Sequence, residues 1–198
     1  QNTQEQTKST TQTRGFFGRL IQQNLDGPDT QNSQINHAEQ SLQGVRLQSG
    51  GSTQIQAAKD IAAQSLQVQA NQNAQLQAGG QLTLDSSTVD AKGTLGISAA
   101  AATIANSLLQ SGNNLGIQTT QGDLTLSASD IKAAGNATLD SAGALQLLAT
   151  EQKSTVDNTS TTRHNPSNVQ AGGNATLTSQ RDLTAQGSTI TAGQDLKL

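Results

Sequence analysis

The residues of this 198-residue chain that could bind a metal or transfer protons are few and far apart. Its two histidines, His37 and His164, are separated by 127 positions, and the chain contains no cysteine. A zinc site in a protein needs several nitrogen, sulfur or oxygen ligands that converge on one point. We therefore expect two solvated histidines and no metal or cofactor site.

Three aspartates, Asp60, Asp123 and Asp182, are spaced more regularly, at 63 and 59 residues. Two carboxylates act together on a glycosidic bond only when they lie about 5–10 Å apart. In the repeat described below, each spacing corresponds to three coils, or roughly 14 Å, which is too far for that chemistry. Aspartate also favours bends, and no serine has the context of a nucleophile elbow. We expect bend-forming aspartates and no enzyme activity.

Composition narrows the range of partners. The net charge is −3 and only 13% of residues are charged, which argues against nucleic acid as a partner. No apolar run approaches the ~18 residues of an integral membrane segment. The first residues, QNTQEQTKST, lack the basic start and apolar core of a signal peptide, so we expect the chain to begin inside a longer protein.

A repeat of about 21 residues organises most of the chain. Successive anchor residues are separated by 21, 21, 20, 22, 38 and 21 positions. These apolar anchors are Leu47, Val68, Val89, Leu109, Ile131, Val169 and Ile190. Further apolar or small residues recur two, six, eight, and about 14 and 16 positions after each anchor, so every repeat holds three pairs with i, i+2 spacing. Such a pair lies on one face of a β-strand.

This pattern predicts an all-β fold, a right-handed parallel β-helix of three-strand coils of about 21 residues. One coil cannot bury its inward pairs alone, whereas stacked coils share a narrow continuous core, and crossovers between parallel strands are right-handed by default. Leu, Ile, Val and Phe make up only about 19% of the chain, a level at which disorder is also considered. The register of the rows argues against disorder. It also argues against helices in the alanine-rich segments QAAKDIAAQSLQ and ISAAAATIANSLLQ, which propensity alone would allow.

Polar residues mark the bends between the strands. Glycine or asparagine follows the first pair in every repeat, and we interpret these residues as supplying positive φ in a tight bend. An asparagine recurs at the next position, at Asn73, Asn114, Asn136 and Asn174. We interpret this row as a polar ladder that satisfies backbone groups at the turn, with glycan or surface recognition as the alternative.

Two segments fall outside the frame, which divides the chain into four parts. Residues 1–46 form an irregular polar excursion that ends in a partial coil, 47–149 form coils, 150–167 form a polar loop insertion, and 168–198 form further coils that stop before a third strand. The excursions resemble each other, EQTKSTTQTR against EQKSTVDNTSTTR. They are either tolerated surface loops or partner contacts, and the candidate contact residues are Arg14, Phe16, Phe17, Arg19, Arg163 and His164.

Units such as AGGNATLTSQRDLTAQGSTITAGQDLKL, with the two excursions and the RGFFG motif, resemble the haemagglutinin repeats of filamentous-haemagglutinin-like exoproteins. The resemblance covers nearly the whole chain and is strongest from Leu47 to Leu198. It implies export through an outer-membrane two-partner-secretion transporter and a long β-helix at the bacterial surface. The family includes adhesins and the stalk proteins of contact-dependent growth inhibition systems.

Two functions therefore remain open. The first is a shaft segment of a secreted surface adhesin, a rigid rod with a host or bacterial cell-surface receptor as partner. The second is the stalk of a growth-inhibition toxin, which helps to deliver a toxin to neighbouring bacteria. Because the last coil stops before its third strand, we also expect the chain to be a piece of a longer rod.

Overall fold

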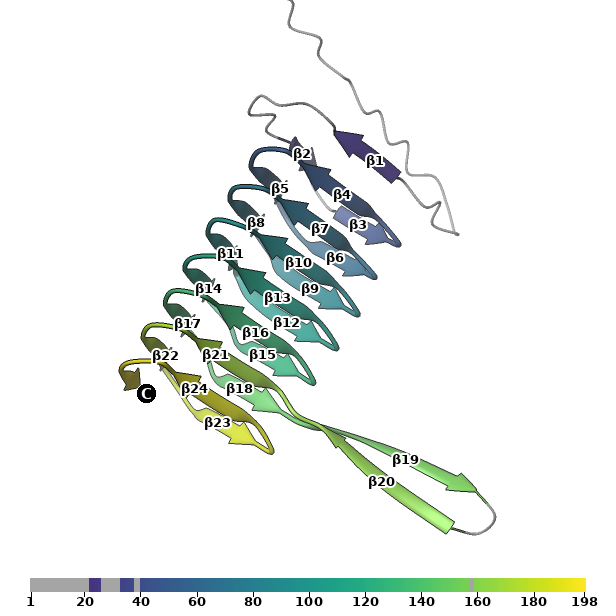
Figure 1. The fold of residues 1–198 in the computed structure, drawn as a ribbon, viewed down its shortest axis with the longest axis vertical. Helices are drawn as coiled ribbons and strands as arrows, with labels where there is room; N and C mark the ends of the chain where they lie inside the picture. Colours follow the sequence, from purple (N-terminus) through teal and green to yellow (C-terminus); the bar gives the residue numbers. More distant parts are fainter. Residues whose placement is uncertain (1–21, 26–32, 38–39, 157–158) are drawn as a thin grey trace, which may run out of the picture.

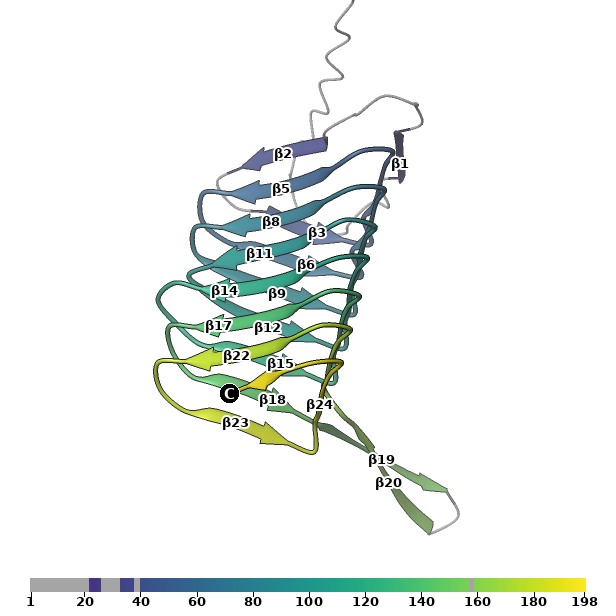
Figure 2. The ribbon, with the colours of Figure 1, turned by 60° about the vertical axis from the view of Figure 1, so that its left-hand side comes forward.

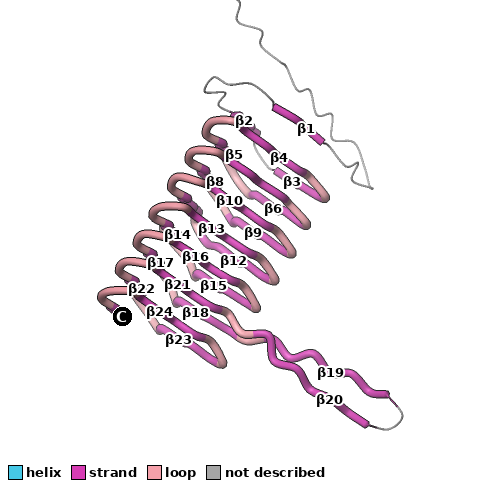
Figure 3. Tube along the Cα trace, viewed as in Figure 1, coloured by secondary structure: helices cyan, strands magenta, loops and turns pink. Residues whose placement is uncertain are grey.

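The protein is an elongated stack of β-coils, and each coil contributes one strand to each of three parallel sheets (Figures 1 and 2). The computed structural model describes residues 22–25, 33–37, 40–156 and 159–198. These residues form strands, bends and turns without a helix (Figure 3), and both alanine-rich segments are strands. The predicted solenoid with a repeat of about 21 residues is confirmed.

The bounds of the strands follow the order of the sheets. The first sheet contains β1 (Gln22–Leu25), β4 (Arg46–Ser49), β7 (Gln67–Ala70), β10 (Thr88–Ala91), β13 (Leu108–Ser111), β16 (Asp130–Ala133), β21 (Asn168–Ala171) and β24 (Thr189–Ala192). The second contains β2 (Ser33–His37), β5 (Thr53–Ala57), β8 (Ala74–Ala78), β11 (Leu95–Ala99), β14 (Leu115–Thr119), β17 (Ala137–Ser141), β22 (Ala175–Ser179) and β25 (Leu196–Lys197). The third contains β3 (Gln40–Gln43), β6 (Ile61–Gln64), β9 (Gln81–Asp85), β12 (Ala101–Ala105), β15 (Leu124–Ser127), β18 (Leu145–Leu148) and β23 (Leu183–Gln186).

The strands pair in the register that the repeat predicts. Each anchor faces the anchor of the next coil, from Leu47 opposite Val68 through Ile131 opposite Val169 to Val169 opposite Ile190. The 20-, 22- and 38-residue spacings are therefore absorbed in the bends, and no sheet loses its register. Strands β1, β2 and β3 extend all three sheets ahead of Leu47.

Inward side chains form one narrow core along the stack. Most strands of the central coils alternate between buried and more exposed residues, as in β8, where the pattern begins and ends on buried alanines. The fully buried large side chains include Ile55, Leu76, Ile117 and Leu124. Many other inward residues are alanines, so the core needs few large apolar residues, which explains the low apolar content of the chain.

An asparagine row holds the first bend, between the first and second sheets. The Oδ1 atom of Asn136 accepts a hydrogen bond from the backbone N–H of Asn174 in the next coil at 2.8 Å, and Asn174 accepts one from Asp195 N–H at 3.0 Å. Asn73 and Asn114 act in the same way on the coils that follow them. The interpretation of this row as a ladder for backbone groups is confirmed.

Glycines at the first bend make room for this ladder. A Cβ atom on Gly173 would overlap Asn136 Oδ1, and one on Gly93 would overlap Asn73 Oδ1. The expectation that the glycines and asparagines of this bend supply positive φ is wrong. Among the described residues, positive φ occurs at the third bend, between the third sheet and the next coil, at Gly44, Ser65, Ser86, Asn106, Ala128 and Gly187.

Buried serines line the inside of the third bend. Ser107 Oγ accepts a hydrogen bond from Ser87 N–H at 3.0 Å, and Ser129 Oγ accepts one from Ser107 N–H at 3.2 Å. Each hydroxyl also donates to a carbonyl of its own coil, as Ser129 does to Ser127 O at 2.8 Å. The backbone that turns inward at this corner therefore keeps its hydrogen bonds, although water does not reach it.

The asparagine and glycine of neighbouring coils should be energetically coupled. We expect Asn136→Ala to cost about 1 kcal/mol through the lost hydrogen bond and Gly173→Ala about 1–3 kcal/mol through overlap with the carboxamide. The double variant should cost less than the sum by about 1 kcal/mol, because the shorter side chain removes the overlap. Urea unfolding of the four chains measures this coupling.

The matched control is Gly193→Ala, whose added Cβ would overlap the carbonyl oxygen of Gly172 and not a side chain. Its cost should add to that of Asn136→Ala. Equal coupling for both glycines would contradict the explanation.

Candidate functional site

The most prominent departure from the rod is an insertion at one third bend. In the coil before it, Ala128 separates the end of β15 from the buried Ser129. In the insertion coil, Ala149 occupies the position of Ala128 and Ser167 that of Ser129, because Ala149 N–H donates to Gln186 O at 2.9 Å as Ala128 N–H donates to Leu148 O at 3.1 Å. Ser129 and Ser167 are 38 positions apart where a coil normally takes about 21, and the 17 extra residues are those between Ala149 and Ser167.

The serine row passes through this insertion without a break. Ser167 is fully buried, its Oγ accepts from Ser129 N–H at 3.3 Å, and it donates to Leu148 O at 2.8 Å. The base of the insertion therefore has the hydrogen bonds of an ordinary bend, and the rod continues below it.

The inserted residues form a β-hairpin that projects sideways from the stack (Figure 1). Its strands are β19 (Thr150–Val156) and β20 (Thr159–Asn165), which pair antiparallel along seven residues. They form a sheet of their own with no third strand. The segment expected as a polar loop thus has regular structure, because alternating Thr and Ser side chains suit a solvated strand.

The hairpin carries two of the predicted contact residues. Arg163 and His164 are neighbours on β20, so they lie on opposite faces of the hairpin. Arg163 pairs across the strands with Gln152, and His164 with Glu151. His164 Nδ1 lies 3.7 Å from Glu151 Oε1, and both side chains are more than half exposed, so this pair contributes little to stability.

The other predicted contact residues, Arg14, Phe16, Phe17 and Arg19, lie outside the described residues. His37 lies in β2 of the first described coil, and His164 lies in the hairpin near the other end of the stack (Figure 1). The two excursions therefore do not bring the histidines together. Across the described ranges, no group of three or more His, Asp or Glu side chains is arranged to hold a metal ion.

The aspartate row acts in the bends, as the sequence predicts. Asp60 Oδ1 accepts a hydrogen bond from Gln81 N–H at 2.6 Å, and Asp123 Oδ1 accepts one from Ala144 N–H at 2.8 Å. Each carboxylate thus secures the next coil at the second bend, between the second and third sheets, in the way that the asparagines act at the first.

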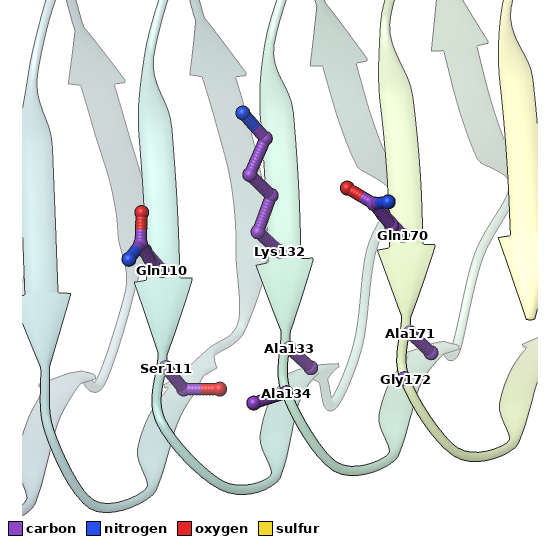
Figure 4. Close-up of a pocket in the computed structure, with 8 residues that line it drawn as sticks. All are labelled: Gln110, Ser111, Lys132, Ala133, Ala134, Gln170, Ala171 and Gly172. Atoms are coloured by element: carbon purple, nitrogen blue, oxygen red, sulfur yellow. The ribbon is translucent and has the colours of Figure 1, made fainter. Parts of the chain in front are cut away.

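A shallow depression of about 300 Å³ lies on the outer face of the first sheet. Figure 4 shows Gln110, Lys132 and Gln170 side by side on three neighbouring strands, above the small residues of the first bend. Lys132 is the one titratable residue that lines it, and its Nζ lies 3.7 Å from Asp130 Oδ2. The depression offers amides and one ammonium group without a neighbouring acid and base that could share a proton.

Family comparison agrees with this geometry. Two family models match the chain, one described as "Haemagglutinin repeat" over residues 30–84 and 48–128, and one described as "Hemagglutinin repeat" over residues 97–162 and 152–198. The chain belongs to the haemagglutinin repeat family. Neither the curated proteins nor the solved structures yielded a match. The matched ranges span the coils and the hairpin, so the hairpin lies within a haemagglutinin repeat.

Haemagglutinin repeats build adhesin shafts, and this haemagglutinin repeat chain has the form of a shaft segment. Within the part of the chain that the structure describes, no helix has the length and apolarity that a bilayer span requires.

Two features of this haemagglutinin repeat solenoid escaped sequence reasoning. One is the buried serine row, whose signal is a serine two positions before an anchor, as in Ser87, Ser107, Ser129 and Ser167. The other is the pairing of β19 with β20, whose signal is two runs of β-favouring Thr and Ser on either side of a short Asp-Asn segment.

Removal of the hairpin should leave the haemagglutinin repeat rod folded. Deletion of residues 150–166 joins Ala149 directly to Ser167, and we expect Ala149 to adopt positive φ as Ala128 does. The free energy of unfolding should change by no more than about 1 kcal/mol, since a shorter loop offsets the unfavourable φ. Circular dichroism and thermal unfolding measure the outcome.

Deletion of residues 150–167 is the matched control and differs by one residue. It removes the buried hydroxyl and shifts the following strand by one position, which turns its inward residues outward. This variant should lose cooperative unfolding. Similar behaviour of the two deletions would contradict the assigned insertion point.

Proposed function

We propose that the chain is a shaft segment of a secreted bacterial surface adhesin, a stiff rod that holds binding elements away from the cell. The observation that carries this proposal is the continuous register of all three sheets on both sides of the hairpin. Because neighbouring coils share one core, the rod resists bending between repeats, unlike a string of separate domains. An uninterrupted solenoid is therefore suited to spacing and display.

The sides of the rod support this role. Outward residues of the first sheet are mainly amides, including Gln48, Gln69, Gln110 and Gln170, and the third sheet presents the row Thr83, Thr103 and Thr125. Such a surface is well solvated and lacks a large apolar patch. Contact with a receptor then falls to the elements that leave the rod.

We further propose that these elements touch a receptor on a host or bacterial cell. On the hairpin, Arg163 and His164 present donor groups on opposite faces. In the other excursion, Arg14 and Arg19 flank Phe16 and Phe17, and aromatic residues beside arginine are typical of contact anchors.

Export fits the same architecture. In the proposed route, the chain leaves the cell through an outer-membrane two-partner-secretion transporter and reaches the bacterial surface. Each emerging coil can dock on the coil before it, since every coil contacts only its neighbours, and stepwise docking would favour outward movement.

Beads coated with the 198-residue chain should bind cells, and the hairpin should account for part of that binding. We expect deletion of residues 150–166, and the substitution of Arg163 and His164 by Ala, to lower bead binding several-fold. The control Lys132→Ala removes a charge from the face of the rod and should bind like the parent chain. Counting of beads on host and bacterial cells provides the measurement.

Full binding by a hairpin-free chain with an intact β spectrum would refute the contact role of the hairpin. Absence of binding by the parent chain would restrict the rod to spacing. A toxic C-terminal domain in the full-length protein, with inhibition of neighbouring cells, would assign the rod to the alternative role as a growth-inhibition stalk.

A further inference from the structure

The hairpin has two long strand edges without partners. Strands β19 and β20 pair only with each other, so the outer edge of each presents unpaired backbone N–H and C=O groups to solvent. The described side chains near its base, including Glu151, Lys153 and Arg163, are exposed, so no apolar face anchors the hairpin to the core. An isolated two-stranded hairpin is marginally stable in water, and addition of a further strand would stabilise it.

The edge of β19 is complementary to itself in charge. Glu151 and Lys153 lie two positions apart and therefore project from the same face of the strand. When two copies of β19 pair antiparallel about a two-fold axis at Gln152, Glu151 of each copy lies opposite Lys153 of the other. Opposite charges directly across a strand pair are favourable, and here the symmetry makes two such pairs.

We propose that this edge binds a second copy of the same chain. The two hairpins join through β19 into a four-stranded antiparallel sheet centred on Gln152, and this sheet links two rods. The interface is isologous, so it closes at two copies. The pairing goes beyond the shaft function and does not depend on it.

Other arrangements of the hairpin edges are less favourable. Parallel pairing of two β19 strands places Glu151 opposite Glu151 and Lys153 opposite Lys153, and antiparallel pairing centred on either residue also opposes like charges. Strand β20 contains Arg163 and His164 but no acid, so it cannot form such charge pairs with itself. A lone lysine would protect an edge from pairing, whereas the Glu151 and Lys153 combination permits one register.

Charge exchange on β19 tests the proposal. We expect the parent chain to show concentration-dependent dimers in sedimentation equilibrium, weakened by salt because the charges are exposed. Glu151→Lys alone or Lys153→Glu alone replaces two attractive pairs by two repulsive pairs and should weaken the dimer about tenfold. The double exchange, and an equimolar mixture of the two single variants, should both restore association.

Lys132→Glu is the control, because it changes the same charge on the face of the rod and should leave the dimer unaffected. A parent chain that stays monomeric at millimolar concentration would overturn the proposal. So would single variants that dimerise normally, or a double exchange that fails to recover.

Cross-linking provides a second, independent readout. Since the chain has no cysteine, Gln152→Cys introduces a single thiol that faces its own copy across the two-fold axis. Mild oxidation should give a disulfide-linked dimer much faster than with Thr161→Cys, which lies on the same face but on the other strand. Equal rates for the two variants, or ladders of higher oligomers, would exclude pairing through β19.

Discussion

The structure depends on one constraint: each coil is satisfied only by its neighbours. A strand in this stack has no hydrogen-bond partner within its own coil, and a coil of inward alanines and leucines encloses too little apolar surface to fold alone. Every row must therefore keep its register from one coil to the next. Variation in the repeat length from 20 to 22 residues is tolerated because the bends absorb it before the next strand begins.

The corners enforce this register through polar groups as well as through apolar packing. Asn136 reaches forward to the backbone of the following coil at the first bend, Asp123 does so at the second, and Ser129 closes the third from within. The glycine that follows in the next coil at the first bend is the counterpart of the asparagine side chain. Such coupled positions explain why a chain with so few large apolar residues specifies a single arrangement.

Much of this architecture could be predicted from the sequence, because the physics of a solenoid repeats at every coil. Period-two pairs such as Leu124 and Leu126 determine the strands, and the anchor spacing determines the register. The basis of the bends was harder to predict. The backbone freedom expected of Gly173 is instead space for Asn136, and positive φ falls on residues such as Ala128 whose type gives no indication of it. The strands of the hairpin depend on the pairing of polar residues with each other, for which no buried face provides a periodic signal.

The position of the hairpin has a consequence for how such proteins diversify. It replaces nothing in the rod: Ala149 and Ser167 keep the places that they would have in an ordinary bend, and the serine hydroxyls continue past it. Sequence and length in the projecting strands can then drift under selection by partners, while the shaft evolves under selection for folding alone. Every third bend of the stack is in this sense a socket, and one gene can acquire new surface specificities without renegotiating its core.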